Sequence, residues 1–166
     1  MLVMGEDTYL LTAVKPEESS GLVNQSYINI YHLDEEQSYK PSLVLTLDAA
    51  SFNAKQLIVE DIAIDSNSNI YIVDQQVGVR TFQYLKSNRI VRGPSYQFAG
   101  TYHKLSVLLQ DTNKTIVLLG AEGEIKELEY KGKTLTLVRK YELPEDFEWD
   151  ESAELALNSH YFTLKT

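Results

Sequence analysis

Carboxylates crowd around a single aromatic side chain near the carboxyl end of the chain. Residues 145–151 contain five acidic side chains on either side of Trp149, the only tryptophan. Paired carboxylates can act as general acid and base where burial raises the pKa of one of them. The same composition is typical of a solvated acidic loop, and an exposed tryptophan within such a loop would suit a basic protein partner.

A second group of oxygen ligands has the spacing that opens a calcium-binding loop. Asp65, Asn67 and Asn69 occupy alternate positions, as hard oxygen ligands do when they wrap one ion. The rest of the pattern differs, because Ile70 stands where such a loop needs glycine and Gln76 where it needs a bidentate glutamate. Aspartate and asparagine also favour hairpin turns. The segment therefore predicts a turn rather than a metal site.

The remaining reactive side chains are scattered along the chain. The histidines His32, His103 and His160 are far apart in the sequence, so a zinc site would require the fold to gather them. The sequence has no cysteine, no nucleophile elbow around a serine and no glycine-rich phosphate loop. We therefore expect no catalytic residue, no metal and no cofactor.

The composition is that of a folded acidic domain. The chain has 166 residues, 43% of them hydrophobic, and a formal net charge of −9, which argues against binding to nucleic acid. Its most basic segment holds Lys86, Arg89 and Arg92 and is typical of a solvated strand edge. The sequence shows no basic leader followed by a long apolar run, so we expect neither a signal peptide nor membrane insertion. The sequons at Asn24 and Asn113 matter only if the protein is secreted.

A pattern of apolar strand, polar turn and apolar strand recurs along the chain. Tyr9, Ile70, Ile116 and Tyr161 begin the second strand of each copy. The spacings from Ile70 to Ile116 and from Ile116 to Tyr161 agree with the roughly 40 to 50 residues of a propeller blade. We therefore predict an all-β, β-propeller-like chain of four-stranded antiparallel blades, with about three and a half blades present. The approximate bounds of these blades are 1–48, 57–98, 103–142 and, for the partial blade, 153–166.

The predicted blades are too few to close a ring. Closed propellers have typically four to eight blades, so residues 1–166 form a single propeller segment that does not close alone. We expect that the segment belongs to a larger propeller, or that another chain completes it, including a second copy of the same chain. An open β-solenoid or a β-sandwich is the structural alternative.

One predicted blade is similar to those of a known group of propellers. Residues 61–74 place Asp61, Asp65 and Asp74 around two apolar strands and a turn, and residues 78–82 form a strand with an aromatic residue. This segment resembles a blade of the NHL and gluconolactonase-like propellers. The resemblance implies the propeller fold, which carries enzymes, receptors and scaffolds alike.

The resemblance covers about one blade well and has two departures. Ser68 and Asn69 replace the turn glycine that is usual in that group. The next unit has Gly120 in the place that corresponds to Asp74. The match therefore bears on the fold and does not imply an activity.

Propellers usually bind ligands on the face that carries the loops between blades and between the second and third strands. On this analogy we predict a binding surface formed by Glu60, Asp61, Gln75, Gln76, Tyr96, His103 and Trp149. A repeat fold without a catalytic motif favours a non-catalytic module that binds a protein partner or serves as a structural part of a larger assembly. The alternative is a metal-dependent lactonase or hydrolase of the gluconolactonase-like type, with Glu60 or Asp61 near a central divalent ion.

Overall fold

Most of the chain that can be described is β-strand. The computed structural model describes residues 2–4, 7–15, 25–97, 101–111, 114–148, 154–157 and 162–165. These residues form antiparallel sheets, so the prediction of an all-β chain is confirmed. Short 3₁₀ turns lie at Glu35–Gln37 (η2) and Ala50–Phe52 (η3). Within the described part of the chain, no helix is long and apolar enough to cross a membrane.

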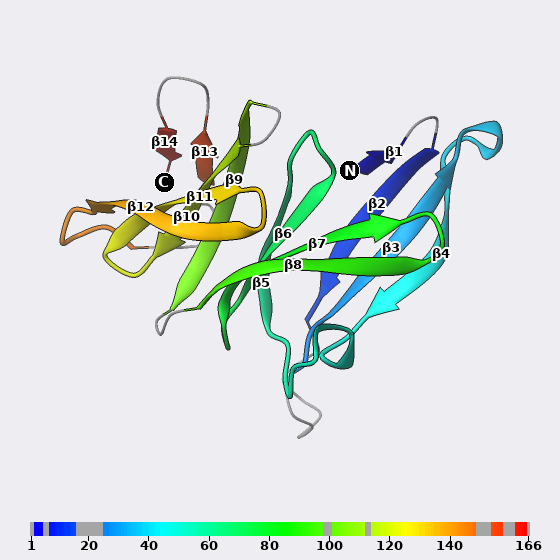
Figure 1. The fold of residues 1–166 in the computed structure, drawn as a ribbon, viewed down its shortest axis with the longest axis horizontal. Helices are drawn as coiled ribbons and strands as arrows, with labels where there is room; N and C mark the ends of the chain where they lie inside the picture. The colour runs from blue at the N-terminus through cyan, green and yellow to red at the C-terminus, as the bar shows by residue number, and fades with distance from the viewer. Residues whose placement is uncertain are drawn as a thin grey trace.

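Each sheet is built from strands that follow one another in the sequence (Figure 1). The first sheet consists of β1 (Leu2–Met4), β2 (Asp7–Val14), β3 (Tyr27–Asp34) and β4 (Lys40–Leu47). The second consists of β5 (Val59–Ile64), β6 (Asn69–Asp74), β7 (Gly78–Leu85) and β8 (Arg89–Gln97). The third consists of β9 (Tyr102–Asp111), β10 (Lys114–Ala121), β11 (Glu124–Lys131) and β12 (Thr134–Glu142). A hairpin follows, made of β13 (Glu154–Leu157) and β14 (Phe162–Lys165).

Strand β6 is buried along its whole length. Successive side chains of a strand point to opposite faces of the sheet. Ile70 and Ile72 accordingly join a hydrophobic core shared with the first sheet, whereas Tyr71 and Val73 join a core shared with the third sheet. The continuous apolar sequence of β6 therefore reflects two covered faces, and the second sheet is packed between its neighbours.

Strand β10 has the corresponding role in the third sheet. Val117 and Leu119 belong to the core shared with the second sheet. Leu118 points the other way and packs with Ile125 and with Leu155 of the β13–β14 hairpin. The hairpin thus covers part of the outer face of the third sheet.

The outer face of the first sheet carries a row of apolar side chains. Leu10, Tyr31 and Leu43 are cross-strand partners on β2, β3 and β4. The adjacent residues Tyr9 and Ile30 point into the core, so this row faces the opposite way. Leu10 is 37% exposed and Leu43 is 56% exposed. Among the described residues, this row is part of no hydrophobic core.

The sheets lie side by side in chain order, with β5 between β2 of the first sheet and β9 of the third. In Figure 1 the β5–β6 turn points to the top, whereas β5 begins at the bottom after η3. We call the lower end, where β5 and β9 begin, the loop end. Because neighbouring strands are antiparallel, β6 and β10 finish at the loop end.

A buried polar network ties the β5–β6 turn to the third sheet. Asp65 Oδ1 accepts hydrogen bonds at 2.9 Å from the backbone N–H groups of Asn67 and Asn69. This bonding pattern confirms that the segment is a turn. Asp65 Oδ2 accepts hydrogen bonds from Asn69 Nδ2 at 2.8 Å, the Tyr71 hydroxyl at 2.7 Å and Thr115 Oγ1 at 2.9 Å. Burial raises the pKa of Tyr71, which keeps its hydroxyl protonated as a donor.

Replacement of Asp65 tests this network. We expect Asp65→Ala to lower the free energy of unfolding by about 3 kcal/mol, because buried donors of Asn69, Tyr71 and Thr115 lose their acceptor. Urea denaturation followed by circular dichroism measures the change. Ser66→Ala, at an exposed position of the same turn, is the matched control and should change stability by less than about 0.5 kcal/mol. Wild-type stability of Asp65→Ala would contradict this role.

Candidate functional site

Part of the predicted binding surface is formed by the loop ends of β5 and β6. Glu60 and Asp61 are the second and third residues of β5. Gln75 and Gln76 directly follow β6, and the Gln75 backbone N–H donates to the Ile58 carbonyl at 3.0 Å. Trp149 lies outside the described residues.

The other described residues of the predicted surface come from the next pair of strands. Tyr96 lies near the end of β8, opposite Val79 of β7, and its half-buried ring packs against the core shared with the third sheet. His103 is the second residue of β9. The structure therefore gathers the described members of the predicted surface at the loop end of two neighbouring sheets.

The Asp61 carboxylate connects the second sheet to the third. One oxygen accepts a hydrogen bond from the backbone N–H of Ile62 at 2.9 Å, and the other accepts one from Leu105 of β9 at 2.7 Å. Burial raises the pKa of Asp61, and the two backbone donors oppose that rise. The Oδ2 atom thus joins β5 to β9, whereas Oδ1 is held by the backbone of β5 itself.

Asp74 organises the turn that carries Gln75 and Gln76. Its side chain is fully buried and forms an ion pair with Arg80 of β7, with 2.7 Å between Asp74 Oδ2 and Arg80 Nε. Asp74 Oδ1 accepts hydrogen bonds from the backbone N–H groups of Gln76 at 3.0 Å and Ile58 at 3.3 Å. A buried carboxylate with this many donors holds the loop end of the second sheet in one conformation.

Glu60 is also engaged, in this case with the first sheet. Lys15 Nζ lies 2.5 Å from Glu60 Oε2. Lys15 directly follows β2 and its side chain is 55% exposed, so this ion pair lies at the surface. This ion pair joins the first sheet to the second at the loop end.

A hollow of about 450 Å³ opens at the loop end of the third sheet. His103 and Thr101 line it from the start of β9, Glu122 from the β10–β11 turn, and Phe147 and Glu148 from the segment after β12. Glu122 and Glu148 are exposed, whereas His103 and Phe147 are half-buried. The hollow therefore combines two acidic side chains with an aromatic ring and an imidazole.

The charge state of His103 follows from this setting. Burial lowers the pKa of His103, while the nearby carboxylates of Glu60 and Glu122 act in the opposite direction. The imidazole is therefore neutral at pH 7 and can accept a hydrogen bond as well as donate one. Sequence reasoning selected His103 but missed Glu122 and Phe147, because only the fold brings their two segments together.

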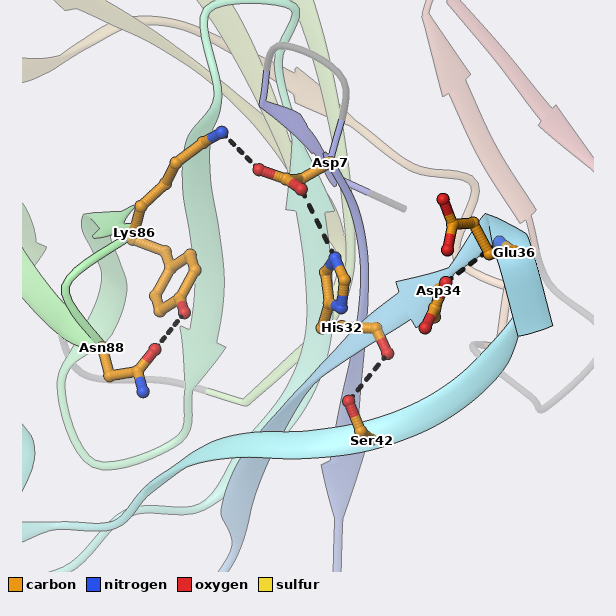
Figure 2. A network of polar contacts seen from close by, with 8 residues as sticks. Asp7, His32, Asp34, Glu36, Ser42, Lys86 and Asn88 are labelled. Atoms are coloured by element: carbon orange, nitrogen blue, oxygen red, sulfur yellow. Dashed lines mark hydrogen bonds and ion pairs between the residues drawn. The ribbon is translucent and has the colours of Figure 1, made fainter. Parts of the chain in front are cut away.

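A different polar cluster lies at the opposite end of the sheets (Figure 2). Asp7 of β2 is placed between His32 of β3, at 3.5 Å, and Lys86 of the β7–β8 turn, with which it forms an ion pair. The Tyr9 ring packs against both His32 and Tyr84, with centroids 5.3 Å and 5.1 Å away. Lys86 lowers the pKa of Asp7. This cluster joins the first sheet to the second, and sequence reasoning missed it.

The structure does not bring the described histidines together. His32 lies near the end of β3 and therefore opposite the loop end, far from the site of His103, and His160 lies outside the described residues. In the part of the chain that the structure describes, no three histidine, aspartate or glutamate side chains are grouped so that they could hold a metal ion. The lactonase alternative places Glu60 or Asp61 beside a divalent ion; in the structure both carboxylates bind protein groups.

Comparisons with known proteins assign this chain to no family. No protein-family model matches the chain, and no curated protein matches it. The resemblance of residues 61–74 to an NHL or gluconolactonase-like blade therefore stays a prediction. Inferences about function rest on the loop end and on the hollow described above.

The setting of His103 predicts its titration. We expect the pKa of His103 to lie below 6.5, the ordinary value, because burial disfavours the imidazolium. Glu122→Gln should lower this pKa further, since the Glu122 carboxylate favours the charged ring. NMR titration of the histidine ring protons measures both values. Glu35→Gln, an exposed change in η2 of the first sheet, is the control and should leave the pKa unchanged. A pKa above 6.5 would contradict the burial of the ring.

The Asp7–Lys86 ion pair predicts a pH-dependent stability. Because the pKa of Asp7 is lowered below 3.8, the pair stabilises the folded chain above about pH 4, and this contribution is lost as the pH falls through the lowered pKa. We expect Asp7→Asn to melt below the wild type at pH 7, with the two melting temperatures converging near pH 2. Scanning calorimetry measures the difference, which should shrink in 1 M NaCl. A difference in melting temperature that changes with neither pH nor salt would argue against the ion pair.

Proposed function

We propose that this chain is a β-propeller segment that acts as a non-catalytic module, which binds a protein partner at the loop end or serves as a structural part of a larger assembly. The observation that carries the proposal is the packing of consecutive four-stranded antiparallel sheets in chain order, with the starts of β5 and β9 at one end. A partner that approaches this end meets loops of successive sheets together. Loops held on a rigid scaffold are common sites of recognition.

The hydrogen bonds of the loop end support recognition rather than proton transfer. The oxygens of Asp61 and Asp74 accept hydrogen bonds from backbone N–H groups and from Arg80, so these carboxylates hold the loops in position. In the hollow, the acidic side chains of Glu122 and Glu148 reach the surface. A rigid support with polar groups at its rim is what a binding surface requires.

The hollow indicates the chemistry of the partner. Glu122 and Glu148 lie beside Phe147 in a chain whose net charge is −9. A lysine or arginine side chain would place its charge near the carboxylates and its methylene groups against the aromatic ring. Electrostatic attraction would also speed the encounter with a positively charged segment. We therefore expect the partner to present a basic, exposed segment.

A photo-crosslinking experiment tests the location of the binding surface. A photoreactive residue is placed at Gln76, which is exposed at the loop end, or at Ser66, which is exposed in the β5–β6 turn at the opposite end. In cells that express the protein, we expect a partner adduct from position 76 and none from position 66. The paired change Glu122→Gln and Glu148→Gln should reduce the adduct at position 76, because it removes the charges that attract a basic segment. Adducts from position 66 alone would move the interface to the opposite end.

A second variant measures the contribution of the predicted surface. The combined change Gln76→Ala, Tyr96→Ala and Trp149→Ala should weaken binding of the crosslinked partner by about tenfold or more, as loss of aromatic contact residues does in other interfaces. Surface plasmon resonance gives the affinity, and circular dichroism checks that the sheets remain intact. Unchanged affinity with an intact fold would assign recognition to another face.

Calorimetry separates this proposal from the metal-dependent alternative. A lactonase or hydrolase with Glu60 or Asp61 beside a divalent ion would release or absorb heat when calcium or zinc is added. A binding module at the loop end requires no such ion. Stoichiometric binding of either metal that is lost in Glu60→Gln would favour the alternative.

A further inference from the structure

A groove lies between the second and third sheets, away from the hollow at the loop end. It has a volume of about 600 Å³ and is lined by β7 and β8 on one side and by β11 and the β11–β12 turn on the other. Its side chains include Arg92, Tyr130 and Lys133. Pockets for small molecules typically have volumes of roughly 300 to 1,000 Å³. The groove is therefore large enough for a small organic ligand.

The charge of the groove is opposite to that of the chain. Arg92 and Lys133 line it together with no carboxylate, although the chain has a net charge of −9. Within the described residues, neither cation has a carboxylate partner and the Tyr130 hydroxyl has no hydrogen-bond partner. By contrast, Lys86 of the same basic segment is paired with Asp7. Unpaired donors on one groove fit an acceptor that carries negative charge.

The Asp65 carboxylate, which belongs to the neighbouring polar network, does not accept hydrogen bonds from Arg92, Lys133 or Tyr130. Asn69 lines the groove and donates to Asp65, whose two oxygens already accept hydrogen bonds from the turn, from Tyr71 and from Thr115. Gln83, which also lines the groove, donates to Asn69 Oδ1 at 2.8 Å. These contacts fix the polar base of the groove and leave Arg92, Lys133 and Tyr130 as its available donors.

The backbone of β8 is held close to β7 at the groove. A Cβ atom at Gly93 would lie 2.3 Å from Thr81 Oγ1, so only glycine permits this approach. Thr81 Oγ1 in turn donates to the Pro94 carbonyl at 2.7 Å, beside an irregularity in the pairing of β7 with β8. The shape of this wall is therefore fixed before any ligand binds, which lowers the cost of binding.

We propose that this groove binds a small organic oxyanion, a carboxylate or phosphate on an apolar or aromatic body. Arg92 and Lys133 bind the charged group, and the Tyr130 hydroxyl donates a hydrogen bond to it. Val91, which is 51% exposed, and Pro94 provide apolar surface for the body of the ligand. This site is separate from the loop end and does not depend on the protein-binding function.

NMR titration of the full chain tests the proposal with two probes, benzoate for a carboxylate and phenyl phosphate for a phosphate. At least one probe should shift the backbone amides of Gly93 and Gly132 in a saturable manner, and the stronger one identifies the anion. Benzyl alcohol, a neutral analogue, should give no saturable shift. The paired change Arg92→Gln and Lys133→Gln should weaken binding by about tenfold or more, because hydrogen bonds to charged groups are lost.

A matched pair of variants separates the groove from general surface charge. Arg89→Gln with Lys131→Gln removes the same charge from neighbouring positions that do not line the groove. We expect this control to change the affinity by less than twofold. Equal weakening by both pairs would overturn the proposal, and so would saturable shifts confined to residues outside the groove or the absence of a saturable shift with both anions.

Discussion

Burial of strand β6 on both faces is the constraint that places the other elements. Ile70 and Ile72 bind the second sheet to the first, and Tyr71 and Val73 bind it to the third. A strand that is apolar throughout cannot leave one face in water, so the second sheet requires a neighbour on each side. The two ends of the sheets, the hollow and the groove all take their positions from this packing, since each is formed where residues of separate strands meet.

Buried and half-buried aspartates fix the orientation of the packed sheets. Hydrophobic contact between two sheets is tolerant of sliding and rotation, whereas a carboxylate with several fixed donors accepts one arrangement. Asp61 binds the backbone of β9, Asp65 binds Thr115 of β10, and Asp74 binds Arg80 and the turn after β6. Residues that resemble ligands or catalytic acids in the sequence thus become structural, and the surface sites are formed by glutamates, cations and aromatic rings around them.

The sequence predicts local features well and assembled features poorly. Strands such as Asn69–Asp74 and Lys114–Ala121 are evident from continuous apolar runs, and the turn at Asp65 follows from its aspartate and asparagines. The grouping of Glu60, Gln76 and His103 at one end also follows from strand order. The cluster of Asp7 with His32 and Lys86 does not, because its members lie on three strands or turns whose register only packing sets. The basic segment shows the same limit, since Lys86 is paired and Arg92 lines the groove.

The order of the sheets along the chain has a consequence for how such a protein can change by inheritance. Each sheet is one continuous stretch of sequence, and its main contacts among the described residues are with the sheets formed by the adjoining stretches. Duplication or loss of a gene segment that encodes one sheet would then add or remove that sheet without changing the connections between the other strands. Only the newly exposed or newly covered outer faces, such as the row of Leu10, Tyr31 and Leu43, would need compensating substitutions.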